Sequence, residues 1–274
     1  MSWETGSQIP RKNEYISNED LLKKKGFLEE REAKLLFYEF LRNNTTFATD
    51  LITGVQLFPF QHMAIKSMLE SDYFLGVWSR GMSKSYTTGI YAVLDAILNQ
   101  GVETGILSRS FRQSKMIFKK IEDIAAKPEA YLLKQCITHV SKSNDEWVME
   151  IGKSRIRALP LGDGEKLRGF RFHRIIIDEF LLMPERIYNE VIVPFLSVVQ
   201  NPTQREELYQ VENNLIKQGK MEEKDRHQWP NNKLIALSSA SFKFEYLYKL
   251  YEQYENLIFN PKKGERTRRC VMQF

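Results

Sequence analysis

The stretch RIIIDEF, residues 174–180, constrains the fold of this 274-residue chain more than any other feature. Ile175, Ile176 and Ile177 are consecutive, so a strand that contains them carries β-branched side chains on both of its faces. Strands covered on both faces belong to parallel sheets flanked by helices, whereas half-exposed strands alternate apolar and polar residues. The run therefore predicts a buried parallel strand of an α/β protein.

The rest of the chain repeats this pattern. Apolar runs of strand length at 73–79, 103–110 and 233–241 are each followed by a helical stretch, and residues 145–161 predict a hairpin around Gly152. Strands that alternate with helices predict a three-layer sandwich, in which helices cover both faces of a mainly parallel sheet.

One main domain is expected. The predicted divisions are a helical lead-in at 1–54 that packs on the core, a main domain at 55–258 with a charged insertion or lid-like segment at 201–232, and the start of a linker at 259–274.

Composition narrows the class of protein. A hydrophobic content of 42% with 27% charged residues is typical of a soluble globular protein. No apolar run is long enough for a membrane span, and the polar N-terminus predicts no secretory signal. Cys136 and Cys270 lie far apart and are expected to be free thiols in a reducing cytoplasm. The net charge of +5 is compatible with nucleic acid but does not require it, and the basic run 262–269 is either a DNA contact or a solvated end.

A variant phosphate-binding loop lies between a predicted strand and a predicted helix. In GVWSRGMSKSYTT, residues 76–88, Lys84 and Ser85 fill the last two places of the pattern G-x-x-x-x-G-K-[ST], but Ser83 replaces the second glycine. Lys84 would contact the β- and γ-phosphates and Ser85 would bind Mg²⁺. Ser83 is tolerable only if its φ is negative or if the loop accepts strain. The alternative is a capped surface helix with an incidental lysine.

Paired carboxylates end the isoleucine strand. Ligands bind outside the carboxyl ends of parallel strands, so Asp178 is expected to hold Mg²⁺ and Glu179 to polarise the attacking water, as in a Walker B motif. The alternative is that both residues only cap a helix. Because the loop with Lys84 stands upstream, the two motifs together favour ATP hydrolysis.

The ordered motifs resemble the large terminase subunits of tailed bacteriophages, which are DNA-packaging ATPases of the ASCE P-loop type. SRGMSKS (79–85) resembles their deviant Walker A motif, with Arg80 at the family's early arginine, and LFPFQHMAI (57–65) resembles their adenine-recognising element, with Gln61 as the amide reader. Three further stretches resemble the next strand and helix, the approach to Walker B, and the coupling motif, at residues 106–121, 164–180 and 236–241.

The resemblance spans residues 55–250 and implies a set of site residues. The residues expected to bind ATP are Gln61, Ser79, Arg80, Gly81, Met82, Ser83, Lys84, Ser85, Tyr86 and Ser239. The expected catalytic residues are Lys84, Arg80, Glu179 and Arg168, and the expected Mg²⁺ ligands are Ser85 and Asp178.

The roles of two arginines, Arg80 and Arg168, have alternative interpretations. Arg80 would reach the γ-phosphate or sense Glu179, or it is a solvent arginine. Arg168 is the expected finger for a neighbouring subunit's phosphate, since the glycine after it favours an exposed turn. Arg171 and Arg174 compete for that role, although strand alternation places Arg174 opposite Ile175, which suits a structural salt bridge.

Other candidates have structural readings as well. Gln61 is otherwise an exposed amide at a helix start, and Ser239 is otherwise an ordinary serine at a sheet edge. Phe58, Phe60 and Met63 are interpreted as core rather than as base-stacking residues. The four histidines show no metal-ligand spacing, so no metal beyond the Mg²⁺ of the nucleotide is expected.

The resemblance implies the ATPase motor domain of a viral large terminase. It would hydrolyse ATP to translocate double-stranded DNA into procapsids, as a homo-oligomeric ring on the portal with a small terminase subunit, in the cytoplasm of the infected host and without a membrane. Large terminases continue into a ribonuclease H-like nuclease, but a second set of strand-end aspartates is not found, so an ATPase fragment without nuclease activity is expected. The alternatives are a helicase-like or other DNA-remodelling ATPase, and a non-catalytic nucleotide-binding scaffold.

Overall fold

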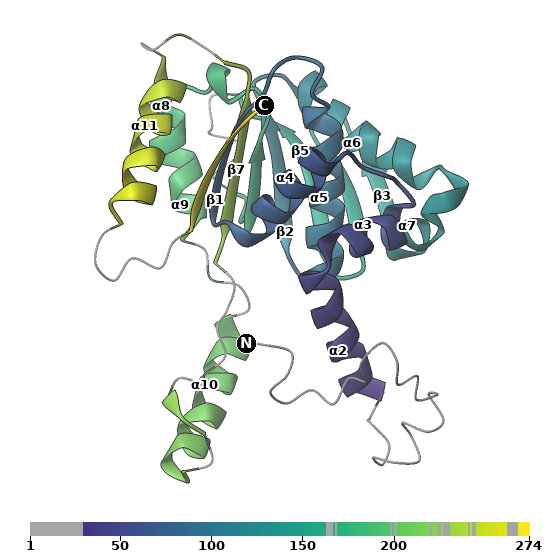
Figure 1. Ribbon diagram of the computed structural model, residues 1–274, viewed down its shortest axis with the longest axis vertical. Helices are drawn as coiled ribbons and strands as arrows, with labels where there is room; N and C mark the ends of the chain where they lie inside the picture. Colours follow the sequence, from purple (N-terminus) through teal and green to yellow (C-terminus); the bar gives the residue numbers. More distant parts are fainter. Residues whose placement is uncertain are drawn as a thin grey trace. The chain divides into compact units, whose positions relative to one another are not determined.

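A computed structural model describes residues 30–162, 167, 169–197, 199, 202–219, 221–223, 226, 231–240, 242, 245–261 and 268–274 (Figure 1). The chain divides into two compact units, residues 1–44 and residues 45–274. The described part of the first unit is helix α2 (Glu30–Asn43). Asn44 ends this helix by donating from its backbone N–H and its side-chain amide to the carbonyl oxygen of Phe40.

One sheet of eight strands forms the centre of the second unit as far as it is described, in the order β3-β4-β5-β2-β6-β7-β1-β8. The six strands from β5 to β8 in this order are mutually parallel, and β4 is antiparallel to its neighbours β3 and β5. The bounds are β1 (Tyr73–Val77), β2 (Glu103–Ser108), β3 (Ile137–Lys142), β4 (Trp147–Ile151), β5 (Ser154–Pro160), β6 (Arg174–Ile177), β7 (Lys233–Ser238) and β8 (Arg269–Gln273). The predicted parallel sheet and hairpin are both confirmed.

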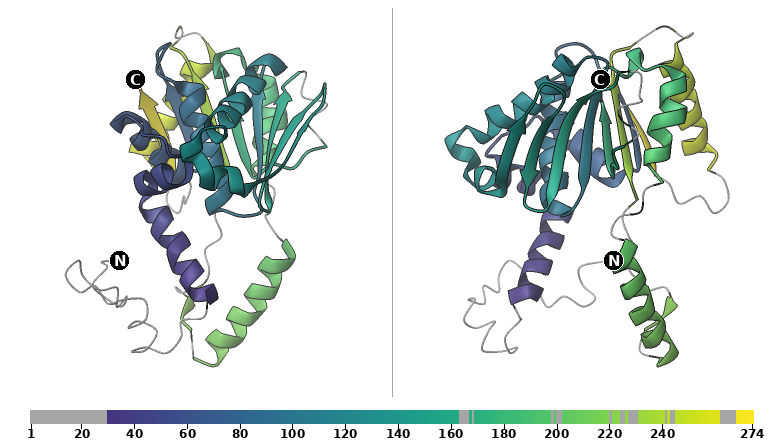
Figure 2. Two further views of the ribbon diagram at one scale, coloured as in Figure 1. Left: turned by 90° about the vertical axis from the view of Figure 1, so that its right-hand side faces the viewer. Right: turned by 180° about the vertical axis from the view of Figure 1, so that it is seen from behind.

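Helices lie on both faces of this sheet (Figure 2). On one face are α3 (Thr45–Thr53), α4 (Pro59–Glu70), α5 (Lys84–Leu98), α6 (Phe111–Ala125) and α7 (Tyr131–Cys136). The other face carries α8 (Glu185–Ile187), a π-helical turn η4 (Tyr188–Ile192), α9 (Val193–Phe195) and α11 (Tyr246–Phe259), which stand against the β6–β8 half of the sheet. Two 3₁₀ turns, η1 (Pro128–Ala130) and η3 (Phe180–Leu182), and helix α10 (Pro202–Lys217) complete the described elements.

The isoleucine strand lies at the centre of the sheet, as its sequence predicts. Ile175 and Ile177 pack into the cluster of buried residues shared with α9 and α11. Ile176, which is also fully buried, alternates to the other face. The three-layer α/β sandwich is therefore confirmed, and β6 brings its carboxyl end, with Asp178, to the middle of one sheet edge.

Two predicted boundaries differ from the structure. Residues 45–53 form α3, which belongs to the larger unit, so the predicted lead-in 1–54 is not one segment. The prediction that 259–274 begins a linker is wrong for Arg269–Gln273, because these residues form strand β8 and pair with β1 along its whole length. Within 201–232, residues 202–217 form α10. Among the described residues, no helix has the length and apolar character needed to cross a membrane.

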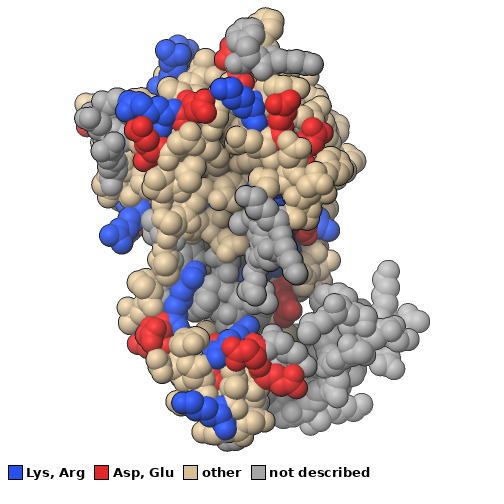
Figure 3. All heavy atoms as spheres, turned by 90° about the vertical axis from the view of Figure 1, so that its left-hand side faces the viewer, with Lys and Arg blue, Asp and Glu red and all other residues tan. Residues whose placement is uncertain are grey.

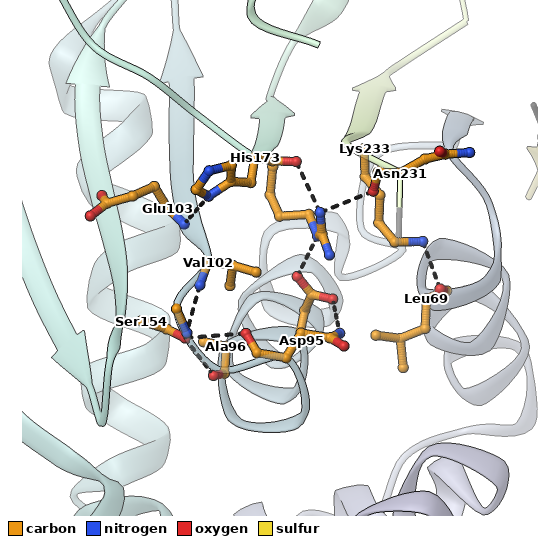
Figure 4. A network of polar contacts seen from close by, with 12 residues as sticks. Leu69, Asp95, Ala96, Val102, Glu103, Ser154, His173, Asn231 and Lys233 are labelled. Atoms are coloured by element: carbon orange, nitrogen blue, oxygen red, sulfur yellow. Dashed lines mark hydrogen bonds and ion pairs between the residues drawn. The ribbon is translucent and has the colours of Figure 1, made fainter. Parts of the chain in front are cut away.

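A buried polar network closes the amino edge of the sheet (Figure 4). The Nε of Arg174 lies 2.7 Å from Oδ2 of Asp95, and both side chains are fully buried. Arg174 also donates to the carbonyl oxygens of His173 and Asn231. Lys233 donates to the carbonyl oxygens of Leu69 and Ser71, and burial lowers its pKa to about 8. The predicted structural salt bridge of Arg174 is confirmed, which removes Arg174 from the candidates for a finger.

His173 makes this edge sensitive to acid. Its Nδ1 accepts a hydrogen bond of 3.0 Å from the backbone N–H of Glu103, and burial together with the nearby Arg174 lowers its pKa to about 4. Between about pH 6.5 and pH 4 the unfolded chain binds a proton at this histidine that the native state does not, so stability falls as the pH falls through this window. We expect this group to contribute about 1–2 kcal/mol of pH dependence.

The measurement is urea unfolding at pH 7 and pH 4.5 of the wild type, of His173→Gln and of a His139→Gln control, whose histidine is exposed. The loss of stability on acidification should be smaller in His173→Gln than in the other two proteins. An equal loss in all three would show that His173 does not carry the effect.

Candidate active site

The variant phosphate loop connects β1 to α5. Trp78 follows β1 and is fully buried, whereas Ser79, Arg80 and Gly81 are exposed. Gly81 has a φ of +86°, and a Cβ there would meet no atom within 4 Å, so the backbone conformation and not crowding calls for glycine. Gly81 thus forms a turn at this point of the loop, whereas the usual phosphate-loop pattern has its second glycine two positions later, where Ser83 stands.

Ser83 takes the strained alternative that its position allows. It is the N-cap of α5 with φ 52° and ψ 32°, in the left-handed region. Glu179 is the other non-glycine residue with a positive φ in the described chain, at 56°. Each costs about 1–3 kcal/mol, and strain of this kind is retained mainly at functional sites. Both strained residues therefore lie in the two motifs that the sequence selects.

Lys84 begins α5 and bends back over the loop. Its Nζ donates to the carbonyl oxygen of Trp78 at 2.9 Å and to that of Ser79 at 3.3 Å. These are neutral acceptors, which are weaker partners for an ammonium group than phosphate oxygens. The charge of Lys84 is thus held at the loop by bonds that an anion can replace.

Asp178 follows β6 at the carboxyl edge of the sheet, where its backbone N–H donates to Leu107. Burial and the neighbouring Glu179 raise the pKa of its carboxyl to about 6, against the opposing effects of a hydrogen bond from the backbone N–H of Glu179, of Lys84 and of a hydrogen bond from Ser85. The carboxylate of Asp178 and the hydroxyl of Ser85 are hard oxygen donors of the kind that Mg²⁺ prefers. The structure therefore brings Lys84 and Ser85, at the start of α5, close to Asp178 and Glu179, which follow β6.

Ser238, the last residue of β7, joins the two motifs. Its carbonyl oxygen accepts from the N–H of Trp78 at 2.9 Å, and its Oγ accepts from the N–H of Leu181 at 3.1 Å. Ser238 is fully buried, whereas Ser239, which the sequence selects, is half-buried. Ser238 was not among the residues predicted from the sequence; the signal that indicates it is the strand register, which pairs Ser238 with Val77 immediately before the loop.

The predicted adenine element has an inward-facing amide. Gln61 is 4% exposed, its Nε2 donates to Oγ1 of Thr87 at 3.2 Å, and its Oε1 accepts from the N–H of Phe58 at 2.9 Å. Gln61 is therefore not an exposed amide, and its bonds join α4 to α5. The interpretation of Phe58 and Met63 as core is wrong, because they are 69% and 59% exposed. Their helix α4 packs through its other face.

The remaining predicted residues differ in their contacts and exposure. Ser79 donates to the carbonyl oxygen of Phe274 from both its N–H and its hydroxyl. Met82 and Tyr86 are half-buried beside Lys84, and Arg171 is exposed. Arg168 lies outside the described residues.

A hollow of about 450 Å³ lies away from these motifs, between α4, α11 and β8, and its lining includes Ser67, Arg268 and Cys270. None of the four residues at the carboxyl edge lines it. The candidate site is therefore defined by the chemistry at the ends of β1 and β6 and not by the size of a cavity.

Comparison with known proteins identifies the fold. No protein-family model and no curated protein matches the chain. Solved structures do match: the HK97 bacteriophage large terminase is similar at 15% identity with a TM-score of 0.51, over 80% of this chain and 40% of that one. The large terminase of a thermophilic bacteriophage, in complex with ADP, is similar at 12% identity with a TM-score of 0.52, over 80% of this chain and 45% of that one.

At these identities the likeness is one of fold. This chain has the α/β fold found in phage large terminases, as the resemblance implies, and it spans less than half the length of either of these two.

Proposed function

We propose that this chain is the ATPase domain of a viral DNA-packaging motor of the large-terminase type. The observation that carries the proposal is the meeting of Lys84, Ser85, Asp178 and Glu179 at one sheet edge, with Ser83 and Glu179 both held in the left-handed region. The fold shared with the terminases of HK97 and of the thermophilic bacteriophage supports it. Double-stranded DNA, a homo-oligomeric ring on the portal, a small terminase subunit and the host cytoplasm follow from this assignment.

The side chains have distinct roles in this proposal. Ser85 and Asp178 would hold Mg²⁺, which neutralises charge on the phosphates. Lys84 exchanges its bonds to the carbonyl oxygens of Trp78 and Ser79 for phosphate oxygens, which are stronger acceptors for an ammonium group. Glu179 orients the attacking water and accepts its proton. Arg80 is exposed on the loop and either reaches the γ-phosphate or contacts Glu179.

We propose two changes of assignment, which the geometry supports. The coupling role passes from Ser239 to Ser238, since Ser238 bonds to the residue after β1 and to the segment after Asp178. Base recognition passes from Gln61 to the exposed ring of Phe58, which stacks on Phe60 with centroids 6.2 Å apart. Arg168 stays a prediction as the finger that acts on a neighbouring subunit, with exposed Arg171 as its alternative.

A non-catalytic scaffold is the second candidate, favoured by the serine at position 83. In a scaffold that does not hydrolyse ATP, Glu179 would have no catalytic role. Selection would then have no reason to keep a glutamate in a strained left-handed conformation. A helicase-like ATPase would share the site. The two differ in how duplex DNA affects the rate of ATP hydrolysis, because duplex DNA would stimulate a packaging motor.

Lys84→Ala tests the site. Removing the charge-assisted contact to the phosphates should abolish most of the stabilisation by Mg-ATP, which for the wild type is about 2.7 kcal/mol at an ATP concentration 100 times the Kd. Thermal unfolding with and without Mg-ATP measures this, and Lys66→Ala, which alters an exposed lysine on α4, is the control. ATP hydrolysis is followed in parallel with and without duplex DNA. Equal stabilisation of Lys84→Ala and the wild type by Mg-ATP would overturn the assignment of the loop.

A further inference from the structure

A cluster of cations lies on the side of the sheet away from α11. Three lysine ammonium groups approach the ring of Trp147, at 4.8 Å for Lys115, 5.9 Å for Lys119 and 4.7 Å for Lys142. Two of these lysines belong to α6 and the third ends β3, next to Trp147 in β4. Exposed arginines continue the cluster along the start of α6, and the whole, named here the Trp147 surface, comprises Arg109, Arg112, Lys115, Lys119, Lys142 and Trp147.

Few carboxylates balance these charges. Lys142 pairs with Glu122 at 2.8 Å, but Lys115 and Lys119 contact only aromatic rings among the described residues. Two acidic residues of the hairpin, Glu146 and Glu150, and Glu103 of β2 are bound elsewhere, whereas Asp145 lies exposed in the turn between β3 and β4. Glu103, Glu146 and Glu150 are paired with two arginines, Arg155 and Arg157, which extend from β5.

Those arginines face away from the lysines. Ile156, between them, is buried on the side that packs against α5 and α6, and alternation along β5 places Arg155 and Arg157 on the other face. Trp147 pairs with Ala158, which shares the face of Ile156. One face of the hairpin thus holds a closed ion-pair network, and the opposite face keeps a positive excess.

Two of the ammonium groups of this surface lie close together. The distances to the shared ring place the ammonium nitrogens of Lys115 and Lys142 less than about 10 Å apart, which is comparable to the Debye length of about 8 Å at physiological ionic strength. Although Glu122 pairs with Lys142, salt screens the repulsion between these two ammonium groups only in part. A polyanion that spans the surface would relieve it.

The arrangement selects the kind of polyanion. Arg112, Lys115 and Lys119 are spaced three and four residues apart and so form one row along α6. Ammonium groups already occupy the ring of Trp147, so it offers no open face on which an unpaired base could stack. A row of point charges without a stacking platform suits the phosphates of a duplex, which are contacted without reading sequence.

The location agrees with this partner. Arg109 follows β2, whose Leu107 accepts a hydrogen bond from the backbone N–H of Asp178, so the Trp147 surface begins next to the candidate active site. On the α11 side of the molecule, by contrast, Lys and Arg lie among Asp and Glu (Figure 3). We propose that the Trp147 surface binds the phosphodiester backbone of duplex DNA. The proposal rests on the proposed function, because it supplies that motor with its DNA contact.

The experiment compares two double variants that lose the same charge. Lys115→Gln/Lys119→Gln removes the two lysines without a described carboxylate partner. Lys127→Gln/Lys153→Gln removes two exposed lysines at the opposite edge of the sheet, after α6 and before β5. Binding of a fluorescent 30-base-pair duplex of arbitrary sequence is measured from about 50 to 200 mM salt, the range over which phosphate contacts lose affinity steeply. Thermal stabilisation by Mg-ATP is recorded for each protein.

The first variant should bind duplex at least about fivefold more weakly at low salt, with a slope of log K against log salt that is shallower by about two. The control should match the wild type, and Mg-ATP should stabilise all three proteins equally. Equal losses of DNA binding in both variants would overturn the Trp147 surface and leave the proposed function standing. Wild-type protein that Mg-ATP stabilises but that binds no duplex would overturn both.

A competition experiment distinguishes duplex DNA from an acidic protein, the other kind of partner that carries negative charge. Polyglutamate that displaces the duplex as well as unlabelled duplex does, at equal charge concentration, would assign the surface to an acidic protein and overturn the proposal. Single-stranded DNA that binds more tightly than duplex would do the same.

Discussion

Glu179→Gln should bind Mg-ATP with nearly wild-type affinity and hydrolyse it about 10²–10⁴-fold more slowly. Glutamine has almost the shape of glutamate and can orient a water, but it cannot accept a proton. The position is set by the backbone, since the left-handed conformation of Glu179 and the bond of its N–H to Oδ1 of Asp178 at 3.1 Å do not depend on the carboxylate. The substitution therefore isolates the proton-accepting role.

Single-turnover hydrolysis and Mg-ATP thermal stabilisation measure the two halves of this expectation. Glu185→Gln is the matched control, because Glu185 is an exposed glutamate six residues further along the chain that pairs only with Lys249 among the described residues. It should keep wild-type activity. A Glu179→Gln protein that retains more than about a tenth of the wild-type rate, a loss of under 1.4 kcal/mol, would exclude Glu179 as the catalytic base.

Asp95→Asn should lower the free energy of unfolding by about 3–5 kcal/mol. The Asp95–Arg174 pair is fully buried, and without the carboxylate the guanidinium retains its charge with only two carbonyl acceptors. The penalty comes from that uncompensated charge more than from the lost hydrogen bond. Hence Asp95→Leu/Arg174→Met, which removes both charges, should be less destabilised than the sum of its single variants.

Urea unfolding of Asp95→Leu, Arg174→Met and the double variant gives the coupling energy of the pair, and Asp95→Asn is measured beside them. The surface pair Arg186–Glu190 on α8 and the π-helical turn is the control, because exposed pairs of this spacing contribute less than about 1 kcal/mol. A loss in Asp95→Asn no larger than that in Glu190→Gln would show that the network at the amino edge of the sheet is not a buried charge site.

The sequence predicted the elements whose signals are local. Ile175–Ile177 specify a strand buried on both faces, and the motifs with Lys84 and Asp178 stand directly after strands, so their position at one edge follows from parallel pairing. Whether Ser83 avoids a positive φ or accepts strain could not be decided from residue types, because a serine is compatible with either.

The features that sequence reasoning missed depend on register and on distant pairing. Strand β8 pairs with β1, nearly two hundred residues earlier in the chain, and a short stretch after a basic run gives no local sign of that partner. The choice between Ser238 and Ser239 depends on which of two neighbours points into the sheet edge. Phe58 and Met63 are apolar by composition, but the face of α4 that packs is set by Ala64, Ile65 and Met68.

The tie between Ser79 and Phe274 makes the phosphate loop a composite of two distant parts of the sequence. The carbonyl oxygen of Phe274 accepts from the N–H and the hydroxyl of Ser79, and its N–H donates to Val77, which fixes the point where β1 becomes the loop. Ordinary phosphate loops take their shape from glycines within about eight consecutive residues. Here part of that shape comes from a residue 195 positions away, so a ten-residue window does not contain the whole motif. Because these bonds use the backbone of Phe274, the loop depends on the pairing of β8 with β1 and not on the residue type at position 274.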